Sequence, residues 1–422
     1  MPKFKNQFLG IADQVVVSAT SFAAMLIIAR STNASELGRY AIGLSAIVIL
    51  LTIQDSLITR PYSIQIFKPN GDPREHAFSA LLLSLILSSL AIVTACISAL
   101  HFSVDGDSMQ STKLALTLAL VMPFVLIREF GRRYSFVNLN MRHAFTIDAI
   151  AAICTLLPLV FLGRAGKLDA VTAILALGGG AGLSGIFWFV RMRKVFRFSL
   201  NSVLLTHKQS WQLGKWLLGS QVAMQVQNYA VSWLCLFFLG TSITGTYVAC
   251  ASIIGLANPF LFGFLNLMMP KSVRTLRNKG AVELRRQVLG DAAFLFGMMS
   301  CFTLLIYIFE LKIMAIFYPN VEFAPHSNVL TILALASLVA AIGAPAAIAL
   351  QSDERGRVIA LVSILTCLTG SAISWKFITV YGLVGAAWGL LATETIGAVG
   401  RWWLFLVQGQ REPTLPMERS EF

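Results

Sequence analysis

Polar side chains inside long apolar stretches are the residues of this sequence that could do chemistry. A polar group in the hydrocarbon core of a bilayer costs free energy, so each one is a candidate for function. Gln221, Gln225 and Asn228 follow one another at i, i+4 and i+7, which places them on one face of a helix. This stripe predicts either the wall of a polar cavity or interhelical hydrogen bonds that hold a bundle together, and the spacing fits both.

Glu394 is the acidic residue that lies deepest in an apolar stretch, about halfway along it. Arg401 follows seven residues later, on the same helical face. A desolvated carboxylate at this depth can take up a proton, so Glu394 is a candidate for coupling transport to protons. The alternative is a structural hydrogen bond or ion pair within the C-terminal half of the chain.

Two pairs of charged residues lie near the ends of the first two apolar stretches. Asp55 and Arg60 close the second stretch and are candidates for lining an inner vestibule, unless they snorkel to the interface. Arg30 and Arg39 bracket the far end of the first stretch. They are candidates for attracting an anionic head group, and solvated loop charges are the alternative.

Further charges lie near the ends of later stretches. Asp13 and Asp148 lie near the ends of theirs, and we interpret them as snorkelling to the interface. A cluster follows the fourth stretch: Arg128, Glu129, Arg132 and Arg133. It predicts either a site for anionic lipid phosphates or a plain topological anchor.

Patterns typical of enzymes are missing from the sequence. It has no GxSxG, HExxH or GxxxxGK[ST] motif, and its five histidines are scattered. The six cysteines all lie in apolar stretches without a CxxC pair, which is typical of small buried hydrophobic residues. We therefore expect no catalytic residues, no metal, no cofactor and no enzymatic activity.

The elements that position these residues are long apolar segments. The chain is 56% hydrophobic and 13% charged, and Phe78 to Leu100 contains no charge. A bilayer core about 30 Å thick needs roughly 20 apolar residues per helix. We predict an all-α, polytopic membrane protein with about twelve spans, at residues 10–30, 40–62, 78–100, 113–131, 145–163, 169–192, 212–239, 243–268, 287–309, 327–350, 355–379 and 383–407.

The basic residues predict how these spans are oriented. With the N-terminus inside, 26 of the 33 Lys and Arg residues lie on the cytoplasmic side. The positive-inside rule then places both termini in the cytoplasm. The net charge of +13 is explained by topology, so we expect no nucleic-acid partner.

The chain divides into two similar halves. Gly38-Arg39-Tyr40-Ala41 is echoed 207 residues later by Gly245-Thr246-Tyr247-Val248, although chance similarity is the alternative. Six spans in each half predict parallel repeats. We expect a six-helix lobe at 1–193, a basic cytoplasmic linker at 194–211, a second six-helix lobe at 212–407 and a cytoplasmic tail at 408–422.

The sequence resembles the polysaccharide-exporting flippases of the multidrug/oligosaccharidyl-lipid/polysaccharide exporter (MOP) superfamily. Three features carry the resemblance: the segment from Ala29-Arg30-Ser31 to Glu36-Leu37-Gly38-Arg39-Tyr40, the second-half Gly245-Thr246-Tyr247-Val248, and Met269-Pro270 before a basic loop. The twelve-span layout extends it over nearly the whole chain.

The resemblance implies a multi-pass transporter of the bacterial inner membrane. It would flip an undecaprenyl-pyrophosphate-linked oligosaccharide by alternating access between two lobes, for lipopolysaccharide or exopolysaccharide export. Arg30, Arg39 and Arg60 would hold the pyrophosphate. Membrane lipids, a polysaccharide polymerase and a chain-length protein would be its partners.

Three alternatives stay open at this point. A multidrug extruder of the same superfamily, an antiporter, would use a mid-membrane acid such as Glu394. A polysaccharide polymerase or ligase would usually carry a large external loop, for which the short predicted outer loops leave no room. A non-transporting assembly partner is the third.

Overall fold

The computed structural model describes residues 2–66, 72–104, 109–193, 196–197, 200–319, 323, 326–352 and 356–408. Within these ranges the regular secondary structure is entirely helical. The predicted tail at 408–422 lies outside the described residues except for its first position. The all-α prediction is confirmed for the part of the chain that is described.

The first half of the chain holds seven α-helices and one π-helical turn. Their bounds are α1 Pro2–Ser31, α2 Ala34–Gln54, the π-helix η1 Asp55–Thr59, α3 Arg60–Gln65, α4 Pro73–Val104, α5 Met109–Val137, α6 Met141–Arg164 and α7 Ala170–Met192. Side chains at helix starts explain several of these bounds. Asn33 caps α2, and Asp169 forms a capping box with Thr172 at the start of α7.

The second half holds longer helices that reverse at glycines. It contains α8 Leu200–Ile254, the 3₁₀ turn η3 Gly255–Ala257, α9 Asn258–Phe317, α10 Ser327–Ser352 and α11 Gly356–Gln408. Gly240, Gly280 and Gly382 have φ of 84°, 82° and 59° inside α8, α9 and α11. Positive φ is available to glycine at little steric cost, so the helix direction changes at these three positions.

These reversals account for the predicted number of spans. In the described residues, nine continuous helices are long and apolar enough to cross a membrane, and two of them contain the three reversal glycines. Dividing those helices at the glycines gives twelve crossing segments, as the sequence predicted. The chain is a multi-pass membrane protein.

Two segments expected to be irregular are largely helical. Residues 200–211 of the predicted linker belong to α8, and residues 269–279 and 281–286 of the predicted basic loop belong to α9. In α8, the buried hydroxyl of Ser210 accepts a hydrogen bond of 3.4 Å from Gln65 Nε2 of α3. Packing against another element therefore supports helix in a stretch whose polar composition indicated a loop.

The chain forms two compact units. Unit 1 comprises Met1–Leu256 and Leu311–Ser327, and unit 2 comprises Ala257–Glu310 and Asn328–Phe422. These units are defined by contacts, whereas the lobes expected from the sequence are defined by its internal repeat. The predicted lobe boundaries therefore stay a prediction.

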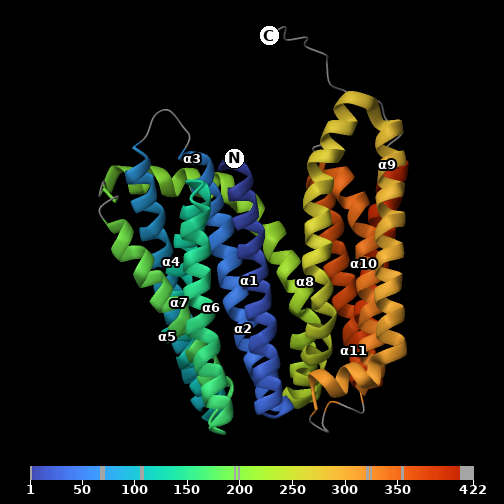
Figure 1. The fold of residues 1–422 in the computed structure, drawn as a ribbon, viewed down its shortest axis with the longest axis horizontal. Helices are drawn as coiled ribbons and strands as arrows, with labels where there is room; N and C mark the ends of the chain where they lie inside the picture. The colour runs from blue at the N-terminus through green and yellow to red at the C-terminus, as the bar shows by residue number, and fades with distance from the viewer. Residues whose placement is uncertain are drawn as a thin grey trace. The chain divides into compact units, whose positions relative to one another are not determined.

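Unit 1 is a bundle in which α1 packs on α6, α4 and α7 pack on α5, and α2 packs on α8 (Figure 1). Its aromatic core joins Tyr62, Phe130 and Trp188, with the rings of Phe130 and Trp188 edge to face at 5.7 Å. Gly131 lies directly beneath Trp188, because a larger residue there would overlap the indole. This core fixes the end of α5 that carries the charged residues described below.

The contact between α2 and α8 is built on two glycines. A Cβ on Gly38 would overlap the carbonyl oxygen of Thr241, and a Cβ on Gly245 would overlap that of Ala34. Ser35 and Thr241 also share a hydrogen bond of 2.5 Å between their hydroxyl oxygens. The two positions that echo one another in sequence thus face one another, as in small-xxx-small helix contacts.

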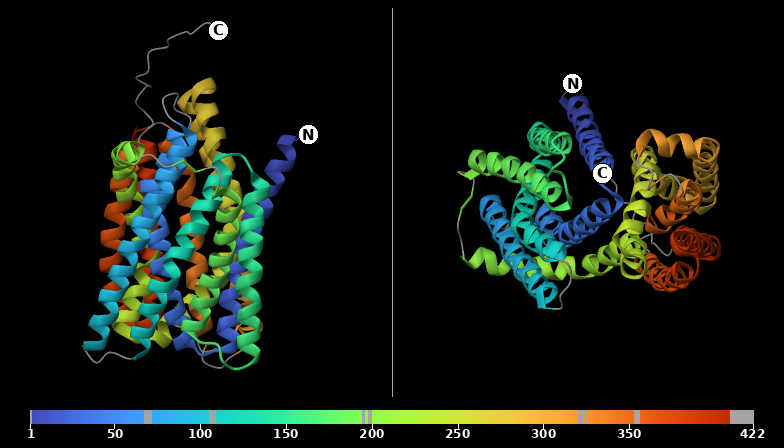
Figure 2. Two further views of the ribbon diagram at one scale, coloured as in Figure 1. Left: turned by 90° about the vertical axis from the view of Figure 1, so that its left-hand side faces the viewer. Right: turned by 90° about the horizontal axis from the view of Figure 1, so that it is seen from below.

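Unit 2 packs α10 against α9 and α11, which Figure 2 shows in yellow to red. One apolar cluster contains Val288, Ala346 and Leu404, and a second contains Leu295 and Ala341. Polar contacts brace the α9 hairpin, where Lys271 pairs with Asp291 at 2.9 Å.

Candidate functional site

A run of charges near the end of α5 organises the polar interior of unit 1. Arg128, Glu129, Arg132 and Arg133 have the spacing i, i+1, i+4 and i+5, which places all four on one side of the helix. The sequence indicated either a site for lipid phosphates or a topological anchor for this cluster. In the structure, all four residues pair with carboxylates or guanidinium groups of unit 1.

The inner part of this network surrounds two buried carboxylates. Arg132 lies 2.7 Å from Asp148 of α6 and 3.1 Å from Asp13 of α1, and Arg128 also pairs with Asp148. The side chain of Asp148 is fully buried and that of Asp13 nearly so. Neither acid snorkels to the interface, because each has a guanidinium partner inside the bundle.

The outer part of the network contains two of the predicted site residues. Asp55 Oδ2 lies 2.6 Å from Arg60 Nε, and Asp55 Oδ1 lies 3.4 Å from Arg133 Nη2. Arg133 in turn pairs with Glu129 at 3.0 Å, which links this part to Arg132. The whole network therefore balances four arginines against four acids: Arg60, Arg128, Arg132 and Arg133, and Asp13, Asp55, Glu129 and Asp148.

A π-helical turn positions Asp55 and Arg60. The backbone N–H of Arg60 donates to the carbonyl of Asp55, five residues back, and Pro61 follows at the start of α3. A proline has no N–H to continue the ordinary ladder, which is consistent with the wider turn before it. Such turns within α-helices frequently occur at functional sites.

The predicted polar stripe of α8 reaches this outer part. With its amide oxygen turned toward Arg60, Gln221 accepts from Arg60 Nη2 at 2.9 Å and from Nη1 at 3.2 Å. Farther along α8, Asn228 donates to Gln225 Oε1 at 3.3 Å. The structure therefore brings together Asp55, Arg60 and Gln221, with Gln225 and Asn228 on the same helix.

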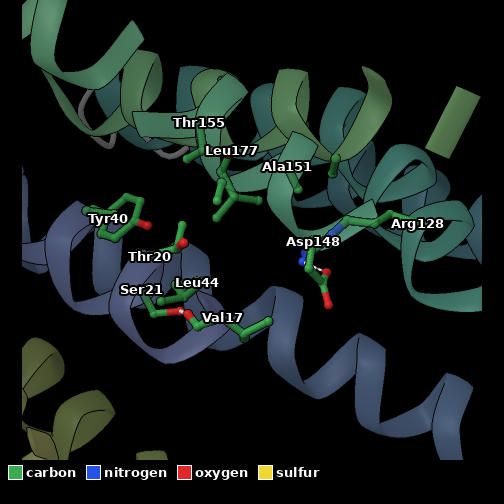
Figure 3. A pocket seen from close by; sticks show the side chains of 13 residues that line it. Val17, Thr20, Ser21, Tyr40, Leu44, Arg128, Asp148, Ala151, Thr155 and Leu177 are labelled. Carbon is green, nitrogen blue, oxygen red and sulfur yellow. Dashed lines mark hydrogen bonds and ion pairs between the residues drawn. The ribbon is translucent and has the colours of Figure 1, made fainter. Parts of the chain in front are cut away.

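A cavity of about 100 Å³ lies inside unit 1 (Figure 3). Arg128 and Asp148 line one part of it, and the hydroxyl side chains of Thr20, Tyr40 and Thr155 lie among apolar residues in the rest. Its walls come from α1, α2, α5, α6 and α7. The buried end of the ion-pair network thus borders an internal cavity with mixed polar and apolar walls.

The other cationic candidates have partners elsewhere in unit 1. Arg30 donates to the backbone oxygens of Ile316 and, at 3.0 Å, Phe317. These carbonyls end α9, where a cation is favourable. Arg39 pairs with Glu36, which also accepts a hydrogen bond of 2.8 Å from the N–H of Ala170 at the start of α7.

Glu394 lies in unit 2 and has a cationic neighbour. Its Oε2 is 3.7 Å from Arg401 Nη2, and the two side chains are 19% and 24% exposed. Arg401 also donates to the carbonyl of Gly397 at 3.0 Å. The predicted same-face geometry is confirmed, and the ion pair that was the alternative to proton coupling is present. The coupling role of Glu394 stays a prediction.

Sequence reasoning wrongly expected Asp13 and Asp148 to snorkel to the interface and missed their pairing. Asp13 and Arg132 are separated by 119 residues, so no local pattern joins them. The sequence did contain one signal of this pairing. Arg128, Glu129, Arg132 and Arg133 put four charges on one side of a membrane-spanning helix, and charges there need partners. Among the described residues, no group of His, Cys, Asp or Glu has the arrangement of a metal site.

Searches of family models and of curated proteins found no match to this sequence. Solved structures share its fold. An inward-facing multidrug resistance MATE family transporter of the MOP superfamily is 14% identical, with a TM-score of 0.79 over 94% of each chain.

Two further solved structures have the same architecture. A MOP superfamily transporter from Pyrococcus furiosus is 13% identical, with a TM-score of 0.68 over 95% of this chain and 94% of that one. A Vibrio cholerae MATE transporter is 13% identical, with a TM-score of 0.64 over 96% of this chain and 95% of that one. The protein therefore has the fold of the MATE transporters, a multi-pass helical membrane fold with two lobes.

Proposed function

We propose that this protein is an alternating-access transporter that flips a lipid-linked oligosaccharide, of the undecaprenyl-pyrophosphate type, across the bacterial inner membrane. It is not an enzyme in this proposal. The fold supports a transporter, because solved structures that share it over nearly their full length are transporters. The substrate class rests on the site in unit 1.

The observation that carries the substrate class is the exposed cation beside a polar stripe. The Arg60 side chain is 46% exposed although its Nε is already paired, and Gln221 lies against its guanidinium. A planar guanidinium suits the oxygens of a phosphate group, and amides suit sugar hydroxyls. Gln221, Gln225 and Asn228 would then contact the saccharide, while the lipid tail stays in the bilayer.

The remaining site assignments follow from the same proposal. Asp55 would help to hold Arg60 in place, and Arg30 and Arg39 would attract the head group at the outer end. Glu394 would couple transport to protons. Membrane lipids, a polysaccharide polymerase and a chain-length protein are the proposed partners.

The proposal is tested by following lipid-linked glycan in each leaflet after deletion of the gene. We expect the glycan to accumulate on the cytoplasmic side and to return to the periplasmic side when the wild-type gene is restored. Arg60→Gln should restore much less than wild type, and Lys376→Gln is the matched control. Normal arrival of glycan at the periplasmic side in the deletion strain would reject the proposal.

A multidrug extruder is the second candidate. Multidrug MATE transporters share the fold, and Glu394 is a mid-membrane acid of the kind that a cationic drug would need. In that case the deletion strain would become more sensitive to cationic drugs, and Glu394→Gln would fail to restore resistance. Glycan distribution would be unchanged.

A further inference from the structure

We infer that Asp55 is an internal anion that occupies Arg60 and Arg133 when no substrate is bound, and that the diphosphate of the substrate displaces it. This inference rests on the proposed function, because it concerns the same site. It assigns Asp55 the role of a positioning and competing residue instead of a direct substrate ligand.

The geometry resembles that of a bound phosphate. The two oxygens of Asp55 address two different arginines, Arg60 at 2.6 Å and Arg133 at 3.4 Å. Thr59 adds a hydroxyl donor to Oδ1 at 2.8 Å. The carboxylate thus accepts from two guanidinium groups and a hydroxyl. Phosphate oxygens accept hydrogen bonds from the same donors.

Exposure shows which partner can be exchanged. Arg60 and Arg133 are 46% and 41% exposed, whereas the Asp55 side chain is 16% exposed and lies beneath them. The two guanidinium groups can therefore be reached from outside the bundle while they remain paired with Asp55. The pair between Arg128 and the fully buried Asp148 has no such access.

The local backbone leaves room for the exchange. Asp55 begins the π-helical turn and Arg60 follows its end, so the two residues are joined by the least regular part of this span. Thr59 remains a hydrogen-bond partner for the displaced carboxylate. Gln221 is a neutral neighbour of Arg60, which an anion can replace without separating charges.

Charge repulsion favours the displacement. The network holds equal numbers of arginines and acids, so an added diphosphate makes it net negative and repels the carboxylate that shares its arginines. Asp55 is the acid that contacts both exposed arginines. Its negative charge therefore sets the affinity for the substrate anion.

The test is to titrate purified full-length protein, in nanodiscs of phosphatidylcholine, with farnesyl pyrophosphate and separately with inorganic pyrophosphate. Asp55→Asn should bind both probes about tenfold more tightly than wild type, because one nearby negative charge is removed. Asp55→Ser should have the same effect. It serves as a second variant in case the asparagine side chain disturbs the π-helical turn. Farnesol, which lacks phosphates, should show no change between variants.

Asp72→Asn is the matched control, since it also removes a carboxylate beside an arginine, here Arg197 at 3.7 Å. It should leave the affinity for both probes unchanged. Arg60→Gln should weaken binding in the wild-type background and in the Asp55→Asn background. Equal affinities of wild type, Asp55→Asn and Asp55→Ser for both probes would overturn the inference, as would an equal gain in Asp72→Asn.

The two proposals fail separately. If wild type moves lipid-linked glycan while neither Asp55 variant changes diphosphate affinity, the inference is rejected and the proposed function stands. If diphosphate binding depends on Asp55 but no glycan moves, the proposed function is rejected and the anion site stands.

Discussion

At Arg132, carboxylates from three helices meet one guanidinium group. Asp148 lies at 2.7 Å, Asp13 at 3.1 Å and Glu129 at 3.6 Å. Removing one partner of a buried pair is costly, and without Arg132 the buried Asp13 would lose its guanidinium partner while Asp148 would keep Arg128. The residue therefore holds α1, α5 and α6 together at one end of unit 1.

The first prediction concerns the stability that Arg132 provides. Arg132→Gln should lower the free energy of unfolding by about 3–5 kcal/mol, because Asp13 and Asp148 lose a shared partner. Denaturant unfolding of the purified protein in detergent measures this change. Arg142→Gln, an exposed arginine at the start of α6, is the control and should have little effect. Equal stability of the two variants would contradict the structural role.

The second prediction concerns Glu394 in unit 2. Glu394→Gln should abolish transport driven by a proton gradient while the protein stays folded, because glutamine keeps the size of the side chain and cannot release a proton. Arg401 retains its hydrogen bond of 3.0 Å to the carbonyl of Gly397. Transport into proteoliposomes under an imposed pH gradient measures the effect, with Glu283→Gln as the control. Unchanged transport would remove Glu394 from the coupling mechanism.

At the level of whole helices, α2 and α8 pack closely against one another through glycines. Gly38 and Gly245 each leave no space for a Cβ because a backbone carbonyl of the other helix lies against them. Close approach of two backbones allows dispersion contacts and hydrogen bonds such as the one between Ser35 and Thr241.

The third prediction tests this contact. Gly38→Val should separate the helices and lower the free energy of unfolding by more than about 2 kcal/mol, because an overpacked site has no flexible side chain to yield. Gly179→Val is the matched control, since nothing lies within 4 Å of a Cβ at Gly179 of α7. The same denaturant experiment compares them. A control as destabilised as Gly38→Val would show that valine, and not the contact, is responsible.

For the whole molecule, alternating access requires that contacts closed in one state open in another. The contact between α2 and α8 joins the two halves that echo one another in sequence, and Ser35 and Thr241 mark it. We predict that this contact separates during the cycle of the proposed transporter, although both helices belong to unit 1. A covalent link there should hold the protein in one state.

The fourth prediction uses such a link. In a background with the six native cysteines replaced by alanine, Ser35→Cys with Thr241→Cys should form a disulfide, because the two hydroxyl oxygens are 2.5 Å apart. Oxidation should stop transport and reduction should restore it, as measured in proteoliposomes. Each single cysteine variant is the control. Full transport by the cross-linked protein would exclude separation of α2 from α8.

Much of the fold could be predicted because its signals are local. Apolar length determines a span within about 20 consecutive residues. Gly240 marks a reversal where the sequence indicated a turn, whereas the helical state of 200–211, 269–279 and 281–286 was missed. Those stretches are polar, and their helices depend in part on packing, as at Ser210 against Gln65 of α3.

The sequence by itself determined the helical class and the number of spans, because these follow from composition. It also determined the stripe on α8 and the shared helical face of Glu394 and Arg401, because these follow from the helical period. Only the tertiary structure decided that Arg60 meets Gln221, that Arg30 instead binds the end of α9, and that two acids thought to snorkel are buried partners of Arg132. The physical reason is that an ionic contact between helices depends on which faces pack together. That choice is made by residues more than 100 positions apart, as for Asp13 and Arg132.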